Sequence, residues 1–143
     1  MKYLVATDGS KEARNAVRYA VEQAVTSGAT LEIVHVLEPK AVLQHGELIL
    51  PGADKALELA DRTLERATDL ASEVASEHDA GVQVETTMLT GRPAHAIADH
   101  ARETGVDAIY IGHQGLSEEH EKHLGSVAKA LLGKVEIPVT VVR

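Results

Sequence analysis

The sequence contains no cysteine, no phenylalanine and no tryptophan, and only three tyrosines. The lack of cysteine excludes disulfides, thiolate metal sites and a cysteine nucleophile. The scarcity of aromatic residues argues against a nucleic-acid site that stacks bases on aromatic side chains. We therefore expect a hydrophobic core of aliphatic side chains.

Long apolar runs and excess positive charge are also missing. No run approaches the roughly 18 apolar residues of a membrane-spanning helix, and the chain enters a strand pattern at once, without the layout of a signal peptide. With 14 basic against 22 acidic residues the net charge is −8 at pH 7, which repels nucleic-acid backbones and anionic membranes. We expect a cytoplasmic protein with no nucleic-acid partner and no membrane association.

What the sequence does contain is typical of a folded protein of ordinary size. Of its 143 residues, 44% are apolar and 25% are charged, which is the balance of a soluble globular chain. Domains commonly hold about 100 to 150 residues, so we expect one domain spanning residues 1–143.

Short apolar runs alternate strictly with helical patterns along the chain. The apolar runs predict strands at 2–7, 30–37, 81–89, 106–112 and 137–142. The helical spacing of apolar residues predicts helices at 11–27, 54–78, 93–104 and 126–134. Such alternation predicts an α/β fold, a three-layer open sandwich in which four main helices cover both faces of a five-stranded parallel sheet.

Residues 38–53 form the only long stretch without a clear pattern. Three consecutive apolar residues occur in it, Leu48, Ile49 and Leu50. We expect this irregular stretch to pack over the sheet or against a partner, because long loops with apolar residues seldom extend freely into solvent.

Two loops compete for the place where a parallel sheet binds ligands, outside the carboxyl ends of its strands. The first, "ATDGS" at 6–10, follows the first strand, and the second, "GHQG" at 112–115, follows the fourth. If these two strands are neighbours, the loops share one crevice.

The glycines of the second loop are typical of a phosphate-binding loop. Gly112 and Gly115 can adopt positive φ and admit a ligand closely, and Gly125-Ser126 precedes the last helix, whose N-terminus would attract an anion. Ser126 would cap that helix, bind a phosphate oxygen, or do both. The alternative is that Gly112 ends a strand, Gly115 makes a turn and Ser126 is only a cap.

Other catalytic and nucleotide motifs are missing. Gly133-Lys134 is followed by Val135 and does not complete a Walker A loop, and the chain has neither G-x-G-x-x-G nor a G-x-S-x-G nucleophile elbow. We therefore assign no catalytic residue.

Five segments in order resemble the universal stress protein family. They are "VATDGS" at 5–10, "VHVLE" at 34–38, "GRPAHAI" at 91–97, the G-x2-G-x9-G-S pattern from Gly112 to Ser126, and "PVTVVR" at 138–143. The resemblance covers the whole chain. It implies the Rossmann-like fold of the adenine nucleotide alpha hydrolases, with strand order 3-2-1-4-5, and ATP or a related nucleotide between the first and fourth strands.

The resemblance also implies which residues hold the nucleotide. Ala6, Thr7 and Asp8 would line the adenine and ribose side, and Val36 would contact the adenine. The others would follow the ribose and phosphates, with Mg²⁺ expected beside ATP. The implied site residues are Ala6, Thr7, Asp8, Val36, Ile111, Gly112, Gly115, Gly125, Ser126 and Val127. A plainer role is also open for the first loop, because Asp and Ser after a strand often cap the next helix, and Ser10 fits that position. Both roles can hold, with Ser10 as the cap and Asp8 facing the ligand.

The glycine loop departs from the family pattern. His113 and Gln114 stand where the family commonly has a small residue followed by His or Arg, and Glu118, Glu119 and Glu121 would repel phosphates unless they point outward or a divalent cation bridges them. His120 and His123, with His113, do not complete the ligand set of a zinc site, so we expect no metal bound by the protein alone.

The strand at 137–142 would form an edge of the implied sheet, with unpaired backbone groups. Family members usually dimerise through this strand, so the resemblance implies a homodimer; otherwise the 38–53 stretch shields the edge. The leading hypothesis is a nucleotide-dependent regulatory dimer of the stress response that acts on an unknown protein partner. The alternatives are a slow ATPase or phosphoryl-transfer enzyme, and a stress protein that binds no nucleotide and acts through protein contacts.

Overall fold

The computed structural model describes residues 1–38, 42–50, 54–114 and 124–143. Its strands are β1 (Lys2–Ala6), β2 (Thr30–Leu37), β5 (Val84–Thr90), β6 (Ala108–Gly112) and β7 (Val139–Val142), which form one sheet. All neighbours pair parallel in the order β5-β2-β1-β6-β7. In the numbering of the five predicted strands this order is 3-2-1-4-5, which confirms the expectation.

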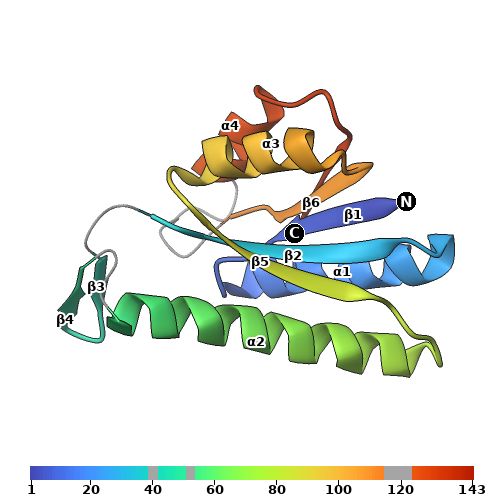
Figure 1. Ribbon diagram of the computed structural model, residues 1–143, viewed down its shortest axis with the longest axis horizontal. Helices are drawn as coiled ribbons and strands as arrows, with labels where there is room; N and C mark the ends of the chain where they lie inside the picture. The colour runs from blue at the N-terminus through green and yellow to red at the C-terminus, as the bar shows by residue number, and fades with distance from the viewer. Residues whose placement is uncertain (39–41, 51–53, 115–123) are drawn as a thin grey trace.

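Four helices cover the two faces of this sheet. Figure 1 shows α1 (Lys11–Ser27) and α2 (Asp54–Glu77) on one face and α3 (Pro93–Thr104) and α4 (Ser126–Leu132) on the other. The predicted three-layer α/β sandwich is confirmed. None of the helices in the described ranges has an apolar stretch long enough to cross a membrane.

The core consists of two clusters, one under each pair of helices. Successive strand residues alternate between them: Val5 and Ile33 belong to the cluster under α1 and α2, whereas Leu4 and Val34 belong to the cluster under α3 and α4. This is the period-two alternation of a strand that is buried on both faces. Apart from Tyr110, the buried apolar side chains are aliphatic, as the composition predicted.

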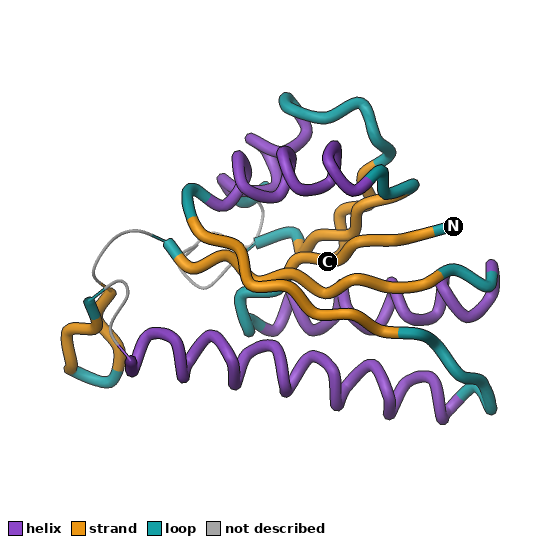
Figure 2. Tube along the Cα trace, viewed as in Figure 1, coloured by secondary structure: helices purple, strands orange, loops and turns teal. Residues whose placement is uncertain are grey.

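The stretch 38–53 differs from its prediction because it contains a hairpin, β3 (Val42–Gln44) and β4 (Glu47–Ile49). The turn residues His45 and Gly46 both have positive φ, as a two-residue hairpin loop requires. The expected packing over the sheet is also wrong. Leu48 and Leu50 are 63% and 57% exposed, and Figure 2 shows the hairpin beside the start of α2, clear of the five-stranded sheet.

Candidate functional site

A pocket opens at the carboxyl ends of β1, β2 and β6, beneath the first turns of α3 and α4. Its empty volume is about 720 Å³, which includes the solvent at its open mouth. The residues that line it are Ala6, Thr7, Asp8, Ala13, Val34, His35, Val36, Glu38, Pro93, Ile97, Ile111, Gly112, His113, Gln114, Gly125, Ser126, Val127 and Ala128.

The loop from β1 to α1 is held by a chain of local hydrogen bonds. Gly9 N–H donates to Thr7 Oγ1 at 3.1 Å, and Ser10 N–H donates to Asp8 Oδ1 at 2.9 Å. Ser10 in turn caps α1, because its Oγ accepts from Ala13 N–H at 3.1 Å. Both roles expected of this loop are therefore present: Ser10 is the cap, and Asp8 lines the pocket.

Strand β2 extends past the end of β1 and presents its backbone to the pocket. The β1–β2 ladder ends with the pair Ala6–Val34, where Thr7 N–H donates to Val34 C=O at 2.9 Å. Val34 therefore directs its backbone polar groups toward β1, and by the alternation of a strand Val36 does the same two residues later. Since β1 has ended there, the N–H and C=O of Val36 face the crevice.

Gly112 lines the pocket as predicted, but the structure gives its missing side chain another reason. A Cβ atom at Gly112 would lie 2.8 Å from the carbonyl carbon of Glu12 and 3.0 Å from the nitrogen of Ala13, in the first turn of α1. Gly112 is also not among the residues with positive φ. Gly112 therefore does not use the positive φ that glycine allows, and the close approach of α1 to β6 gives a reason for glycine that the sequence did not show.

The start of α4 corrects the predicted role of Ser126. The helix begins at Ser126 itself, and Gly125 is the N-cap, with φ −61° and no side-chain cap bond. Ser126 is therefore the first helical residue and not the cap. Gly125 lies against the strand end: its N–H donates to His113 C=O at 2.7 Å, and an added Cβ would lie 2.9 Å from that oxygen.

Nine of the ten predicted site residues line this one pocket; the tenth, Gly115, lies outside the described residues. Glu118, Glu119, Glu121, His120 and His123 also lie outside them. The predicted residues that line the pocket are Ala6, Thr7, Asp8, Val36, Ile111, Gly112, Gly125, Ser126 and Val127.

Sequence reasoning missed several lining residues in addition to the ten. His35 and Glu38 flank Val36 in the segment "VHVLE", and Pro93 and Ile97 belong to "GRPAHAI". The signal was present in both cases, because these segments carried the family resemblance. Nδ1 of His35 lies 2.7 Å from Thr7 C=O.

The described lining of the pocket has acidic side chains but no lysine or arginine. It includes the carboxylates of Asp8 and Glu38 and the imidazoles of His35 and His113. Within the described ranges, no three His, Asp or Glu side chains gather to hold a metal ion.

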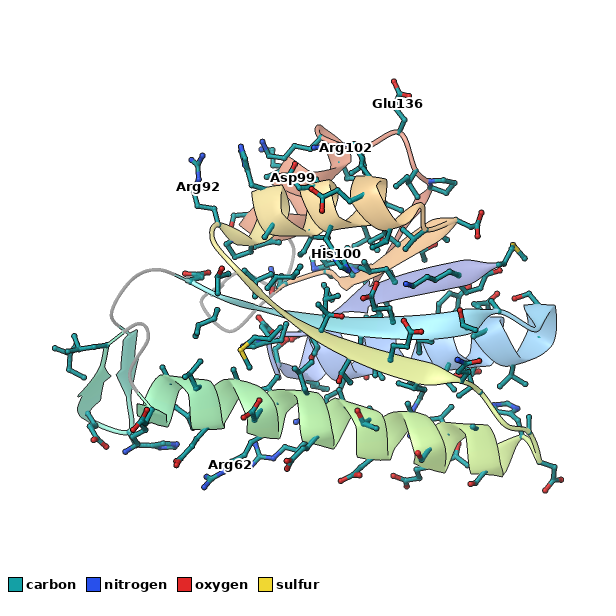
Figure 3. All side chains as sticks on the ribbon, in the orientation of Figure 1. Arg62, Arg92, Asp99, His100, Arg102 and Glu136 are labelled. Carbon is teal, nitrogen blue, oxygen red and sulfur yellow. The ribbon has the colours of Figure 1, made fainter. Side chains whose placement is uncertain are left out.

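A second polar cluster lies under α3 at the opposite end of the sheet. Glu32 on β2 is only 3% exposed, and its Oε2 accepts from Thr87 Oγ1 at 2.7 Å and from His100 Nε2 at 2.9 Å. Figure 3 shows His100 pointing from α3 toward the sheet, whereas Asp99 and Arg102 point outward. The other oxygen, Oε1, lies 3.6 Å from Lys2 Nζ.

The electrostatics of this cluster keep Glu32 ionised. Burial alone would raise the pKa of Glu32, but the hydrogen bonds from Thr87 and His100 and the charges of His100 and Lys2 outweigh burial and hold that pKa below its ordinary value of 4.5. The cluster joins α3 to three strands and does not reach the pocket.

The family model described as the universal stress protein family matches residues 1–143. This chain belongs to the universal stress protein family. The universal stress protein YxiE of Bacillus subtilis is 35% identical to it, over 99% of this chain and 98% of the relative. A universal stress protein of Thermus aquaticus is 36% identical, over 98% of this chain and 96% of the relative.

Solved universal stress proteins share the fold. A structure from Archaeoglobus fulgidus superimposes with a TM-score of 0.76 at 27% identity, covering 100% of this chain and 93% of the other. The universal stress protein of the same organism in complex with dAMP gives a TM-score of 0.75 at 27% identity, covering 100% of this chain and 98% of the other. This universal stress protein thus shares the overall fold of these solved relatives.

Proposed function

We propose that this universal stress protein binds an adenine nucleotide in the pocket at the carboxyl ends of β1, β2 and β6. The observation that carries the proposal is the convergence on one pocket of nine predicted residues from three separate segments, at 6–8, 36 and 111–127. The Archaeoglobus fulgidus relative in complex with dAMP supports the same class of ligand.

The adenine would lie against β2. The N–H and C=O of Val36 face the crevice past the end of β1, and together they match the acceptor N1 and the amino donor on the Watson–Crick edge of adenine. Aliphatic side chains of Val36, Ile97 and Ile111 line the pocket and offer a surface for the purine ring. The lining residues that the structure describes include no phenylalanine, tyrosine or tryptophan.

The ribose and phosphates would extend toward the two loops. Asp8 would accept hydrogen bonds from the ribose hydroxyls, and the backbone from Gly112 to Gln114 and from Gly125 to Val127 would follow the phosphates. Because the described lining holds two carboxylates and no lysine or arginine, ATP would bind together with Mg²⁺, which screens the phosphate charge.

The nucleotide would control what the protein presents to other molecules. In this proposal residues 1–143 act as one domain, and two copies in the cytoplasm pair through the edge strand β7 to form a regulatory homodimer of the stress response. Binding, and not turnover, is the proposed activity.

Calorimetric titration of the purified protein with AMP and with MgATP tests the proposal. We expect saturable binding of one nucleotide per chain. Asp8→Asn keeps an oxygen that can accept from Ser10 N–H but loses the charge toward the ribose, so its Kd should rise about tenfold or more. Asp61→Asn, the same change at an exposed position of α2, should leave Kd unchanged.

Two results would contradict the proposal. One is the absence of binding heat up to millimolar nucleotide with protein from which bound ligand has been removed. The other is an equal loss of affinity in Asp8→Asn and Asp61→Asn, which would place the ligand outside the pocket.

A further inference from the structure

The C=O of Thr7 has a hydrogen-bond partner that the sheet does not predict. Thr7 N–H donates to Val34 C=O on β2. In a regular parallel ladder, Thr7 C=O would then accept from the N–H of Val36, two residues further along β2. That bond is not made in the described chain. Instead, Nδ1 of His35 lies 2.7 Å from Thr7 C=O.

The contact with Thr7 C=O determines which nitrogen of the His35 ring carries a hydrogen. A carbonyl oxygen only accepts, so Nδ1 of His35 must carry the proton and donate. Nδ1 carries a hydrogen in one neutral tautomer and also in the imidazolium ion, and the contact therefore survives a change in the charge of the ring.

We infer that His35 is a positioning residue for nucleobase recognition: its ring occupies Thr7 C=O and thereby keeps the N–H of Val36 available to the ligand. This inference rests on the proposed function, because it assigns a role in adenine binding. The β1 strand stops at Ala6. If the ring were removed, Thr7 C=O would be open to Val36 N–H, and the ladder would extend into the space of the base.

The contact also holds the loop that carries Asp8. Thr7 is only 6% exposed and is tied to β2 through both its N–H and its C=O, the former to Val34 and the latter to His35. One side chain of β2 therefore positions the backbone donor for the base and the start of the loop that faces the ribose.

Two conservative variants separate the positioning role from simple bulk. In His35→Asn the side-chain amide nitrogen occupies the place of Nδ1 and can donate to Thr7 C=O, whereas in His35→Gln the amide is one carbon further out, in the place of Nε2. We expect AMP affinity close to wild type in His35→Asn. Affinity should be about tenfold weaker in His35→Gln and in His35→Ala.

An analogue of AMP in which carbon replaces N1 tests whether the lost contact is the Val36 N–H bond. Wild type and His35→Asn should bind AMP about tenfold more tightly than this analogue, while His35→Ala should bind the two alike. Thermal unfolding of each variant is measured alongside. A role limited to stability would lower the melting temperature and weaken both ligands by the same factor.

The outcomes separate the two claims. If the wild type binds neither nucleotide, both the proposed function and this inference fail. If the wild type binds AMP but His35→Ala still discriminates against the analogue, the nucleotide site stands and the role of His35 is overturned.

Discussion

At Gly112 a neighbouring helix leaves no room for a side chain. The glycine pattern was interpreted as part of a phosphate-binding loop, and the structure shows the backbone of Glu12 and Ala13 packed against Gly112. Glycine spacing alone could not distinguish the two reasons, because both leave the same residue in the same place. The contact depends on where α1 crosses β6, which is a tertiary property.

Gly112→Ala should destabilise the fold. The new Cβ would lie 2.8 Å from the carbonyl carbon of Glu12, so α1 or β6 must shift, at a cost of about 1–3 kcal/mol in the free energy of unfolding. Urea denaturation measures this. Gly81→Ala is the matched control, since no atom lies within 4 Å of its added Cβ and its stability should change by less than about 1 kcal/mol. Equal effects at the two positions would contradict the packing argument.

The lowered pKa of Glu32 predicts that the stability of the fold depends on pH. Its pKa is lower in the folded chain than the ordinary value of 4.5, so the folded state binds this proton less readily than the unfolded state. The ionised carboxylate therefore adds stability at pH above 4.5, and this contribution is lost as the pH falls through the folded pKa. Glu32→Gln should be about 2 kcal/mol less stable at neutral pH, with a smaller difference in acid.

Urea denaturation at neutral and at acidic pH checks this prediction. Glu85→Gln serves as the control, because Glu85 pairs with the same Lys2 at 3.4 Å but is about half exposed, and exposed pairs contribute about 0–1 kcal/mol. A Glu32→Gln variant whose deficit stays constant from neutral to acidic pH would show that shape, not charge, makes the difference.

At the scale of elements, the helices and sheet order were predictable because strong local signals mark them. Ser10 caps α1, and Pro93 occupies the first turn of α3, so both helices begin where the sequence predicts. β1 and β2 begin where predicted, whereas the later strands begin two or three residues after their predicted starts, β5 at Val84 and β7 at Val139. Apolar runs show which residues are buried, whereas the ends of a strand depend on which partner backbone lies beside it.

The β3–β4 hairpin was not predicted because each strand has three residues, too few for an alternation to show. Its turn at His45-Gly46 is the one local signal, and it lacks the usual Asn-Gly or Asp-Gly pair. An ion pair between Glu47 and Lys55 joins the hairpin to α2.

The edge strand β7 carries the prediction on assembly. Ile109 N–H donates to Pro138 C=O, and His113 N–H donates to Val142 C=O. The backbone N–H and C=O groups of even-numbered residues here therefore point toward β6, and the N–H of Val141 points away from the sheet edge. Val141→Pro removes that outward donor and leaves the β6 ladder intact. If two copies pair through β7, sedimentation should find the wild type dimeric and Val141→Pro monomeric at the same concentration.

Two results would contradict this assembly. A wild type that sediments as a monomer at micromolar concentration has no such dimer. A Val141→Pro variant that stays dimeric, with an unchanged melting temperature, would place the interface elsewhere on the molecule.

At the scale of the whole molecule, the location of the pocket follows from topology. Parallel strands direct their carboxyl ends to one edge, so residues from 6–8, 36 and 111–112 had to meet if β1 lies between β2 and β6. The places of His35 and Glu38 in the pocket lining were not predictable in the same way. They depend on side-chain directions past the end of β1, where the regular ladder no longer determines them.

The measurement that tests the central claim most directly is an NMR titration of the ¹⁵N-labelled protein with AMP. The account predicts saturating shifts of backbone amides around the pocket, with Val36, Asp8 and Ser126 among the largest, and little change on the far end of α2. Shifts that are absent at millimolar AMP, or that cluster away from the carboxyl ends of β1, β2 and β6, would contradict it.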